Sequence, residues 1–393
     1  MTDKRKKILF ILGVLDSGGV AKSLVNLINA VDRKTYDVSL LLVSKSRGPY
    51  YDLLPSDLKI IHNDVMSSVG SIKGLKYLLS HGHMLLAIGT LLRLVVACFS
   101  KPWSAYLLSR LMPALSEEYD LIVDYNGQQQ TYYMVDKLKA RKKVAFFHSD
   151  YSKWPYYYKM DKRYYPKLDA IFTISPICVD ALKKYFPEQK NKIHLFENIS
   201  SLQVINKMAE EPIDIKSSAQ WKFLTVGHIC KNKGTDLAIE AAALLKKNDL
   251  DFVWYFIGNT AELPAFMPLV EKYGLQDYFV FLGLKSNPYP YFKMADIVVH
   301  PSLFEGKSVT LDEAKLLCKP VVVTNFSTVG DQFENEVNAN IVEMTPKAIA
   351  NGICDLVSDE DKRQRYATWL QSNCYDNVNE VISVPLKSGP VKY

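Results

Sequence analysis

The strongest constraint on the fold of this chain is a repeated alternation between short apolar runs and amphipathic segments. Short apolar runs are typical of strands that are buried on both faces in a parallel sheet. In the first half, strands are predicted at residues 6–15, 36–43, 119–125, 142–149, 170–175 and 192–198. In the second half, they are predicted at residues 221–227, 251–258, 278–283, 296–302 and 320–325. Amphipathic segments such as 19–31 and 176–186 lie between some of these runs and predict helices that cover the sheets.

Because the alternation occurs in two sets, it predicts an α/β chain with two Rossmann-like, doubly wound domains facing across a cleft. We expect a first domain at residues 1–198 and a second at 220–360. Residues 199–219 are polar and lack periodicity, which predicts a linker. Residues 361–393 are expected to form a C-terminal helix and a tail that return toward the first domain. Ligands of open parallel sheets bind at the carboxyl ends of the strands, so candidate residues are sought there.

Charge and cysteine content limit the class of protein and of partner. Six scattered cysteines without a C-x-x-C pair, and a start without a secretory signal, predict a cytoplasmic protein. Residues 1–200 carry 29 Lys and Arg against 18 Asp and Glu, whereas the remainder carries 19 against 24. A basic half favours an anionic partner. Nucleic acid is not predicted, because no nucleic-acid motif surrounds the short basic clusters. An anionic membrane surface and a merely solvated basic face both remain open.

Two segments of the first half raise the question of membrane contact separately. Residues 84–99 are strongly apolar, but they are shorter than the roughly 20 residues that a spanning helix needs, and Arg93 interrupts them. The segment is therefore either buried in the first domain or lies partly in a membrane interface. An aromatic run with interleaved lysines lies at 151–165. Its rings either pack in the domain, lie at a membrane interface or stack on sugars.

The stretch HPSLFEGKSVTLDEAK at residues 300–315 contains the main candidate site. Its Gly-Lys-Ser is not a phosphate-binding P-loop, because Pro301 stands where that loop needs a glycine. Glu305 follows a predicted strand, and a helix is expected to open at Ser308 or Thr310. The free backbone N–H groups at its start would suit a phosphate or a sugar hydroxyl. Glu313 admits two interpretations, a ligand contact or a capping box with Thr310.

Other candidates stand at the predicted carboxyl ends of strands. Lys233 follows Gly227-His228 and would direct its ammonium at the same edge, unless it is an ordinary exposed loop lysine. His148 ends a predicted strand and is either structural or functional. Gly19 belongs to a glycine pair that lets backbone approach a ligand, although the spacing is not that of a dinucleotide fingerprint.

These pieces together resemble the retaining glycosyltransferases of family four. EGKSVTLDE looks like the E-x7-E motif of that family, and TVGHICKNKGTDLAIEAA looks like its strand with the following glycine-lysine run. DSGGVAKSLVNL resembles its first glycine loop, and FFHSD resembles the part that contains its mid-domain histidine. The match covers nearly the whole chain in order. DEAKLLCKPVVVTN looks particularly like bacterial surface-polysaccharide (capsule) enzymes.

The resemblance implies a GT-B fold, with a nucleotide-sugar donor held mainly by the second domain and an acceptor bound by the first. It implies that Glu313 holds the ribose hydroxyls, that Glu305 contacts hydroxyls of the donor sugar, and that Lys233 neutralises the departing pyrophosphate. His148 would lie near the reacting face of the sugar. Gly19 would let the first loop approach the diphosphate.

The loop of Gly306 and the amides of Lys307, Ser308 and Val309 would meet sugar and phosphate in the same resemblance. The family usually has arginine where this chain has His228, so this phosphate contact is expected to be weaker or to depend on pH. No metal and no cofactor are expected. The two D-x-D patterns at 249–251 and 359–361 are predicted to be surface loops rather than manganese sites.

The predicted function is transfer, with retention, of a hexose-type sugar from a UDP-sugar or related donor to a glycan or polyprenyl-linked acceptor of a bacterial surface polysaccharide. We expect a cytoplasmic protein, peripheral on the inner face of the membrane if residues 84–99 contact lipid. One alternative is a catalytically silent GT-B subunit that binds a partner or a glycan. Another is a GT-B sugar-nucleotide epimerase.

Overall fold

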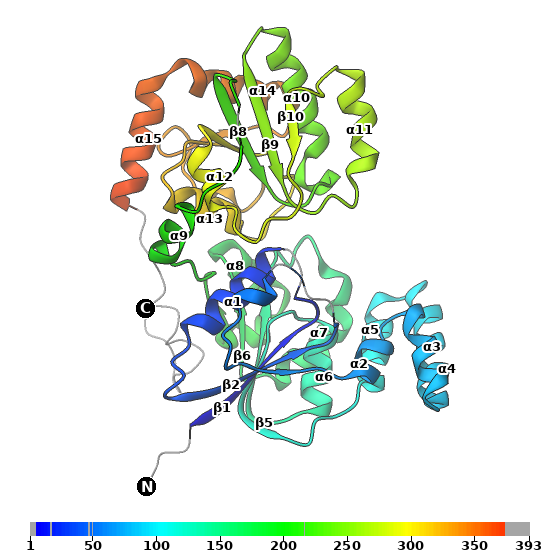
Figure 1. Ribbon diagram of the computed structural model, residues 1–393. Helices are drawn as coiled ribbons and strands as arrows, with labels where there is room; N and C mark the ends of the chain where they lie inside the picture. The colour runs from blue at the N-terminus through cyan, green and yellow to red at the C-terminus, as the bar shows by residue number, and fades with distance from the viewer. Residues whose placement is uncertain (1–4, 16–17, 46–47, 49, 216, 374–393) are drawn as a thin grey trace. The chain divides into compact units, whose positions relative to one another are not determined.

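The computed structural model describes residues 5–15, 18–45, 48, 50–215 and 217–373 (Figure 1). Its internal contacts divide the chain into two compact α/β units, with the main boundary between Glu197 and Asn198 and with Gly18 and Gly19 grouped with the second unit. Each unit is described by itself.

In the first unit, the described residues form a seven-stranded sheet in the order β3-β2-β1-β4-β5-β6-β7, and the neighbouring strands pair in parallel. The strands are β1 Lys6–Leu12, β2 Tyr36–Leu42, β3 Lys59–Ile61, β4 Glu118–Asp124, β5 Lys139–Phe147, β6 Ala170–Thr173 and β7 Ile193–Leu195. The helices are α1 Gly19–Ala30, α2 Asp64–Ser68, α3 Ile72–Ser80, α4 Met84–Ala97, α5 Lys101–Leu111, α6 Gln129–Lys137, α7 Tyr158–Tyr164 and α8 Pro176–Tyr185. Short 3₁₀ turns lie at η1 Tyr51–Leu53, η2 Pro155–Tyr157, η3 Tyr165–Lys167 and η4 Pro187–Lys192.

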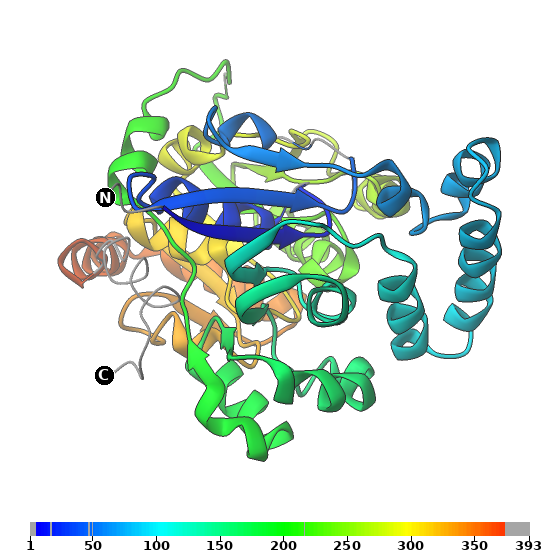
Figure 2. The same ribbon diagram turned by 90° about the horizontal axis from the view of Figure 1, so that it is seen from below.

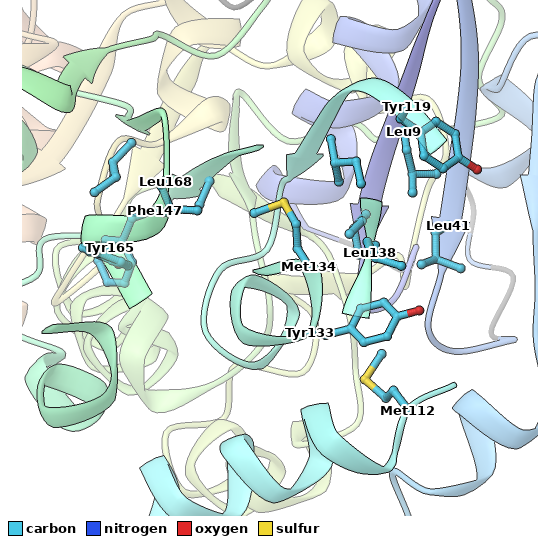
Figure 3. Close-up of a cluster of buried hydrophobic side chains, with 14 of the residues drawn as sticks. Leu9, Leu41, Met112, Tyr119, Tyr133, Met134, Leu138, Phe147, Tyr165 and Leu168 are labelled. Atoms are coloured by element: carbon cyan, nitrogen blue, oxygen red, sulfur yellow. The ribbon is translucent and has the colours of Figure 1, made fainter. Parts of the chain in front are cut away.

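One core of the first unit lies where the apolar runs meet the covering helices. Leu9 of β1 and Phe147 of β5 face the sheet side that Tyr133 and Met134 of α6 cover, as Figure 3 shows. Each of these side chains is at most 6% exposed. Removing such apolar surface from water is the main favourable term in folding, which explains why the strands read as continuous apolar runs.

In the second unit, the described residues form a six-stranded parallel sheet in the order β10-β9-β8-β11-β12-β13. Its strands are β8 Trp221–Val226, β9 Phe252–Ile257, β10 Phe279–Phe281, β11 Ile297–His300, β12 Val321–Thr324 and β13 Asn340–Val342. Its helices are α9 Leu202–Ala209, α10 Thr235–Lys247, α11 Leu263–Lys272, α12 Tyr289–Met294, α13 Val309–Leu316, α14 Pro346–Ser358 and α15 Glu360–Asn373, with 3₁₀ turns at η5 Lys231–Lys233 and η6 Val329–Asp331. Two cores are formed, and they contain Leu224 and Phe223 respectively, which are neighbours on β8.

The predicted α/β fold with doubly wound sheets is confirmed, and each predicted apolar run forms a strand. The strands β3 and β13 were missed. Each has three residues, largely half-buried, and lies at a sheet edge, so neither forms a continuous apolar run.

The predicted linker at 199–219 differs from the structure. It contains α9, whose side chains Ile205 and Ala209 are buried in a core of the second unit. Ser201 caps α9 by accepting a hydrogen bond from the amide of Val204, a start signal that the polar composition concealed. The C-terminal helix α15 contributes Tyr366 and Leu370 to the cores of the same unit. The tail at 374–393, on which the predicted return to the first domain depends, lies outside the described residues.

The apolar segment at 84–99 forms α4, and it is not buried. Only Ala87 and Thr90 of that helix are buried, while Leu85 is 84% exposed. Within the described residues, no helix is both long and apolar enough to cross a membrane. Figures 1 and 2 show α3, α4 and α5 standing together beyond the edge of the sheet of the first unit.

The aromatic run at 151–165 has two different environments. Tyr151 is buried, and its hydroxyl and that of Tyr132 donate hydrogen bonds of 2.7 and 2.6 Å to the carboxylate of Asp161. Trp154 and Tyr156 are 40% and 51% exposed. Part of the run therefore packs, as one of its alternatives stated, and part faces solvent.

One glycine determines how closely two loops of the second unit approach each other. Gly234 has φ +67°, and a Cβ placed on it would lie 1.9 Å from the carbonyl oxygen of Pro301. The neighbouring loops therefore touch backbone to backbone at a position that only glycine fits.

We expect Gly234→Ala to destabilise the protein by more than Gly283→Ala. Gly283 has a similar φ of +69°, but a Cβ there would meet no atom within 4 Å, so it is a matched control for the backbone conformation alone. The control should lose about 1–2 kcal/mol, and the clash at Gly234 should add about 1–3 kcal/mol more. Chemical denaturation of both variants measures the difference. Equal losses would mean that contact with Pro301 does not limit residue 234.

Candidate functional site

The candidate site lies where the strand order of the second sheet reverses. From β8 the chain proceeds outward to β9 and β10, and from β11 it proceeds outward in the opposite direction to β12 and β13. The loops after β8 and β11 therefore lie side by side at the carboxyl edge, the usual ligand position in open parallel sheets. The carbonyl of Asn232 in the first loop accepts hydrogen bonds from the amide of Leu303 (3.0 Å) and the hydroxyl of Ser302 (3.3 Å) in the second.

Three charged or ionisable side chains meet between these loops. The Nζ atom of Lys233 lies 2.5 Å from Oε1 of Glu305, and Nε2 of His300 lies 2.9 Å from the same oxygen. The side chain of Glu305 is 11% exposed, that of His300 4% and that of Lys233 28%. Lys233 is therefore the most accessible of the three side chains.

The ionisation of Glu305 follows from its two partners. Burial by itself raises the pKa of Glu305, but the charge of Lys233 and the hydrogen bond with His300 outweigh burial and hold that pKa at about 2. An ionised carboxylate only accepts hydrogen bonds, so Nε2 of His300 is the nitrogen that donates. Glu305 is thus a fixed negative charge at neutral pH and cannot supply a proton.

The loop that carries Glu305 is held by contacts with the segment after β12. The hydroxyl of Thr328 donates to the carbonyl of Glu305 at 3.0 Å. The side chain of Gln332 accepts from the amide of Ser308 and donates to the carbonyl of Ser308 and the carboxylate of Asp312, each at 2.8 Å. The Ser308 amide, which was expected to meet a ligand, is therefore engaged by Gln332 in this structure.

The predicted capping box at Thr310 and Glu313 is wrong. Helix α13 begins at Val309, and its cap is Ser308, whose hydroxyl accepts from the amide of Leu311. The Thr310 hydroxyl instead donates to the carbonyl of Val226 at the end of β8. The Thr310 hydroxyl bonds to a carbonyl of β8 instead of capping its own helix. A local sequence pattern does not contain that distant partner.

Glu313 lies beyond the first turn of α13 and is 2% exposed. The hydroxyl of Tyr289 donates to its Oε1 atom at 3.1 Å. The remaining predicted residues of this loop differ in exposure. Lys307 lies 3.9 Å from Asp312 in an ion pair and its side chain is 8% exposed, Gly306 and Val309 are buried, and His228 after β8 is exposed.

In the first unit, His148 follows β5 and packs against aromatic rings. Its ring lies 4.6 Å from that of Tyr125 and 5.6 Å from that of Phe146. Burial lowers the pKa of His148 to about 4, against the opposing effect of a backbone hydrogen bond with Tyr125. His148 is therefore neutral at pH 7, and within the described part of the chain its Nε2 atom has no hydrogen-bond partner. Gly19 is the first residue of α1.

The first unit also has a surface pocket that no sequence motif indicated. It has a volume of about 620 Å³ and lies beside the carboxyl ends of β2 and β3, lined by Lys45, His62, Asn63, Asp64, Val65 and Tyr77. Lys45 forms an ion pair with Asp64 at its rim. Its lining residues include hydrogen-bonding and charged side chains, which suit a hydroxylated or anionic group.

No metal site is found among the described residues. The two D-x-D patterns have local structural contacts. The carboxylate of Asp251 accepts from the amide of Gln220 at 2.9 Å, and that of Asp359 accepts from the amide of Lys362 at 2.7 Å, at the start of α15.

Two residues of the candidate site were not predicted from the sequence. His300 is the last residue of β11, and a polar residue at the end of a buried apolar run was a signal that could have identified it. Gln332 lies 24 residues after Ser308 in a segment without a motif, so nothing local indicated its contact.

Comparison with known proteins identifies a family for this arrangement. Residues 208–368, which contain the whole site of the second unit, match the family described as glycosyl transferases group 1. An uncharacterized glycosyltransferase of Methanocaldococcus jannaschii is 21% identical over 245 residues, which cover 53% of this chain and 60% of the relative. The poly(ribitol-phosphate) alpha-N-acetylglucosaminyltransferase of Staphylococcus aureus is 26% identical over 208 residues, covering 49% of this chain and 42% of the relative. The chain thus spans 60% or less of the length of these two curated relatives.

Solved structures resemble the chain over almost its whole length. Anabaena HepE in complex with UDP and glucose has a TM-score of 0.69 at 16% identity, covering 96% of this chain and 97% of that chain. WaaG, a glycosyltransferase involved in lipopolysaccharide biosynthesis, has a TM-score of 0.64 at 14% identity, with coverage of 96% and 97%. At such identities the likeness establishes the fold. The expected GT-B fold is confirmed. The match of residues 208–368 to the group 1 glycosyl transferases supports the expected resemblance to family four.

Proposed function

We propose that this protein transfers a sugar from a nucleoside diphosphate sugar to a glycan or lipid-linked acceptor, with retention at the anomeric carbon. A hexose carried by UDP is the donor that we propose. The single observation that carries the proposal is the contact of Lys233 with Glu305 at the strand-order reversal of the second unit. It joins a cation suited to a diphosphate with a carboxylate suited to sugar hydroxyls, inside the region that matches the family.

The chemistry depends on where negative charge develops. As the bond between the anomeric carbon and the diphosphate oxygen breaks, the leaving group gains charge that a nearby cation stabilises most in the transition state. Lys233 would supply that cation by sharing its Nζ atom between Glu305 and the phosphate. The start of α13 would add the positive end of a helix dipole. Its Ser308 amide would have to leave Gln332 to contact the ligand directly.

Retention follows if the acceptor attacks on the face from which the diphosphate departs. The acceptor oxygen then forms the new bond to the anomeric carbon, and its proton passes to the leaving phosphate oxygen. Glu305 stays ionised and holds donor-sugar hydroxyls rather than acting as an acid, which agrees with its pKa of about 2. The Glu313 carboxylate would accept hydrogen bonds from the ribose hydroxyls, and the hydrogen bond from Tyr289 orients that carboxylate. His148, held neutral, would lie near the reacting sugar face, and Gly19 near the diphosphate.

The biological role that we propose is the synthesis of a cell-surface polysaccharide on the cytoplasmic side of the membrane. Relatives with capsular and ribitol-phosphate polymer roles support it. The pocket lined by Lys45, His62 and Tyr77 is the acceptor site that we propose in the first unit.

The alternatives make different predictions for the donor alone. An epimerase would convert the donor into an isomer without an acceptor, whereas a transferase would show only slow hydrolysis. A silent binding subunit would do neither. Incubation of the purified protein with UDP-sugars, followed by product analysis, separates the three.

We expect Lys233→Ala to reduce kcat for transfer by about 10²–10³-fold, because a preorganised charge at the leaving group is lost. Lys231→Ala is the matched control, since Lys231 lies in the same 3₁₀ turn and is exposed. Transfer kinetics with a UDP-sugar measure both. Equal activity of the two variants would remove Lys233 from the mechanism.

Glu305→Gln should abolish transfer while the protein remains folded. Stabilisation by ligand is a separate readout, because a ligand that binds only the native state raises the apparent melting temperature. UDP should raise the melting temperatures of the wild type and of Glu305→Gln by similar amounts. It should raise the melting temperature of Glu313→Gln by less, because Glu313 is assigned to the ribose. A full UDP shift in Glu313→Gln would contradict that assignment.

The presence of His228 where the family usually has arginine predicts a weaker contact with the diphosphate. A guanidinium donates two parallel hydrogen bonds to a phosphate, which an imidazole cannot do. We expect His228→Arg to lower KM for the UDP-sugar by about tenfold, the worth of one additional charge-assisted hydrogen bond. Transfer kinetics measure the change, and an unaltered KM would show that residue 228 does not contact the phosphates.

A further inference from the structure

Helix α4 presents a continuous apolar side to solvent. Its residues Leu85, Ile88, Leu92 and Val95, with Phe99 just after it, follow one another at intervals of three or four and so lie on one side of the helix. They are 84%, 57%, 56%, 58% and 86% exposed. Large contiguous apolar surfaces of this kind usually mark a binding surface.

Neighbouring segments carry further exposed apolar side chains. They come from α3, from the rest of α4, from α5 and from residues 154–156 next to α5. With the five residues above they define what we call the hairpin face: Ile72, Leu79, Met84, Leu91, Trp103, Trp154 and Tyr156. The ammonium of Lys101 at the start of α5 lies 4.8 Å from the centre of the Tyr156 ring, which places that ring beside the helices.

Helix α4 packs on the rest of the first unit through its opposite side, so the exposed side is not needed for that packing. A Cβ on Gly89 would lie 2.5 Å from the side chain of Leu111, which shows how closely α4 packs on α5. Arg93, the one charged residue of α4, is half-buried and donates to the carbonyl of Gly70 at 3.0 Å. The charge that interrupts the apolar sequence therefore does not interrupt the apolar face.

The charge around the hairpin face indicates which partner can cover it, a second copy of the protein or a lipid surface. Residues 65–116 contain five Lys and Arg and not one Asp or Glu. Lys73 and Lys76 of α3 and Lys101 are exposed, while the exposed Arg110 forms an ion pair with Asp136 at 3.6 Å. A second copy would bring the same positive charge against this face and be repelled, whereas an anionic lipid surface complements it.

We propose that the hairpin face docks on the surface of an anionic lipid bilayer. The apolar side of α4 enters the boundary between headgroups and acyl chains, and the lysines of α3 contact lipid phosphates. Trp103, Trp154 and Tyr156 are of the types enriched at the level of the headgroups. The binding is peripheral, since α4 has 14 residues.

Docking here would also bring the acceptor pocket close to lipid. Tyr77 of α3 lines that pocket, while Ile72 and Leu79 of the same helix belong to the hairpin face. A lipid-linked acceptor could then enter the pocket with its lipid still in the bilayer. This consequence rests on the proposed function, whereas the docking itself does not.

Flotation of the full chain with vesicles tests the proposal. The wild type should bind vesicles of phosphatidylglycerol and phosphatidylcholine at low salt, and bind pure phosphatidylcholine more weakly. Leu85→Gln, Ile88→Gln and Leu92→Gln combined should lower binding about tenfold or more, because less apolar surface enters the interface. The matched control combines Val204→Gln, Leu244→Gln and Leu284→Gln, which change exposed apolar residues of the second unit and should leave binding unchanged.

A second pair of variants tests the charge. Lys73→Gln with Lys76→Gln should weaken binding to the anionic vesicles by about fivefold for each lysine. Lys183→Gln with Lys184→Gln makes the same charge change on exposed positions of α8 and should have little effect.

Three results would overturn the proposal. The first is that the wild type does not bind vesicles at low salt. The second is that the apolar triple variant binds vesicles as strongly as the wild type. The third is that the wild type is a dimer that does not bind vesicles, and that the triple variant is a monomer. Transfer to a water-soluble acceptor should be unchanged in the triple variant. That assay keeps failure of the docking separate from failure of the proposed function.

Discussion

In a parallel sheet every strand directs its carboxyl end to the same edge, and a reversal of strand order leaves two neighbouring loops there with a crevice between them. In the second unit this reversal falls between β8 and β11. The position of the site depends on it. Lys233 comes from the loop after one strand and Glu305 from the loop after the other, 72 residues later. Gly234 lets the loops touch, because a side chain there would collide with Pro301.

The energetics of this cluster suggest why it exists. Removing a carboxylate and an ammonium from water is costly, and their mutual attraction seldom exceeds that cost enough to add much stability. Glu305 stays ionised only because Lys233 and His300 surround it. Lys233 keeps some exposure beside its buried partner, and the proposed contact with an anionic ligand rests on that exposure.

The first unit carries a different kind of unfavourable feature. Apolar side chains on α4 stay in water, where each costs free energy until something covers it. The inner side of the same helix is well packed, so the exposed side is a property of the folded unit rather than a defect of packing. This basic, apolar surface is the feature from which docking of the first unit on lipid is proposed.

The local pattern of the sequence determined the fold class, the long strands and the loops that carry Lys233, Glu305 and Glu313. Runs of buried residues, helix starts and glycine turns are encoded within a few neighbouring positions, so they could be predicted. Only the tertiary structure decided that His300 and Gln332 hold the loop, that Ser308 rather than Thr310 caps α13, that residues 199–219 include a packed helix, and that α4 is exposed. Each of these depends on which residues distant in the sequence compete for one hydrogen bond or cover one surface, and no local pattern contains that information.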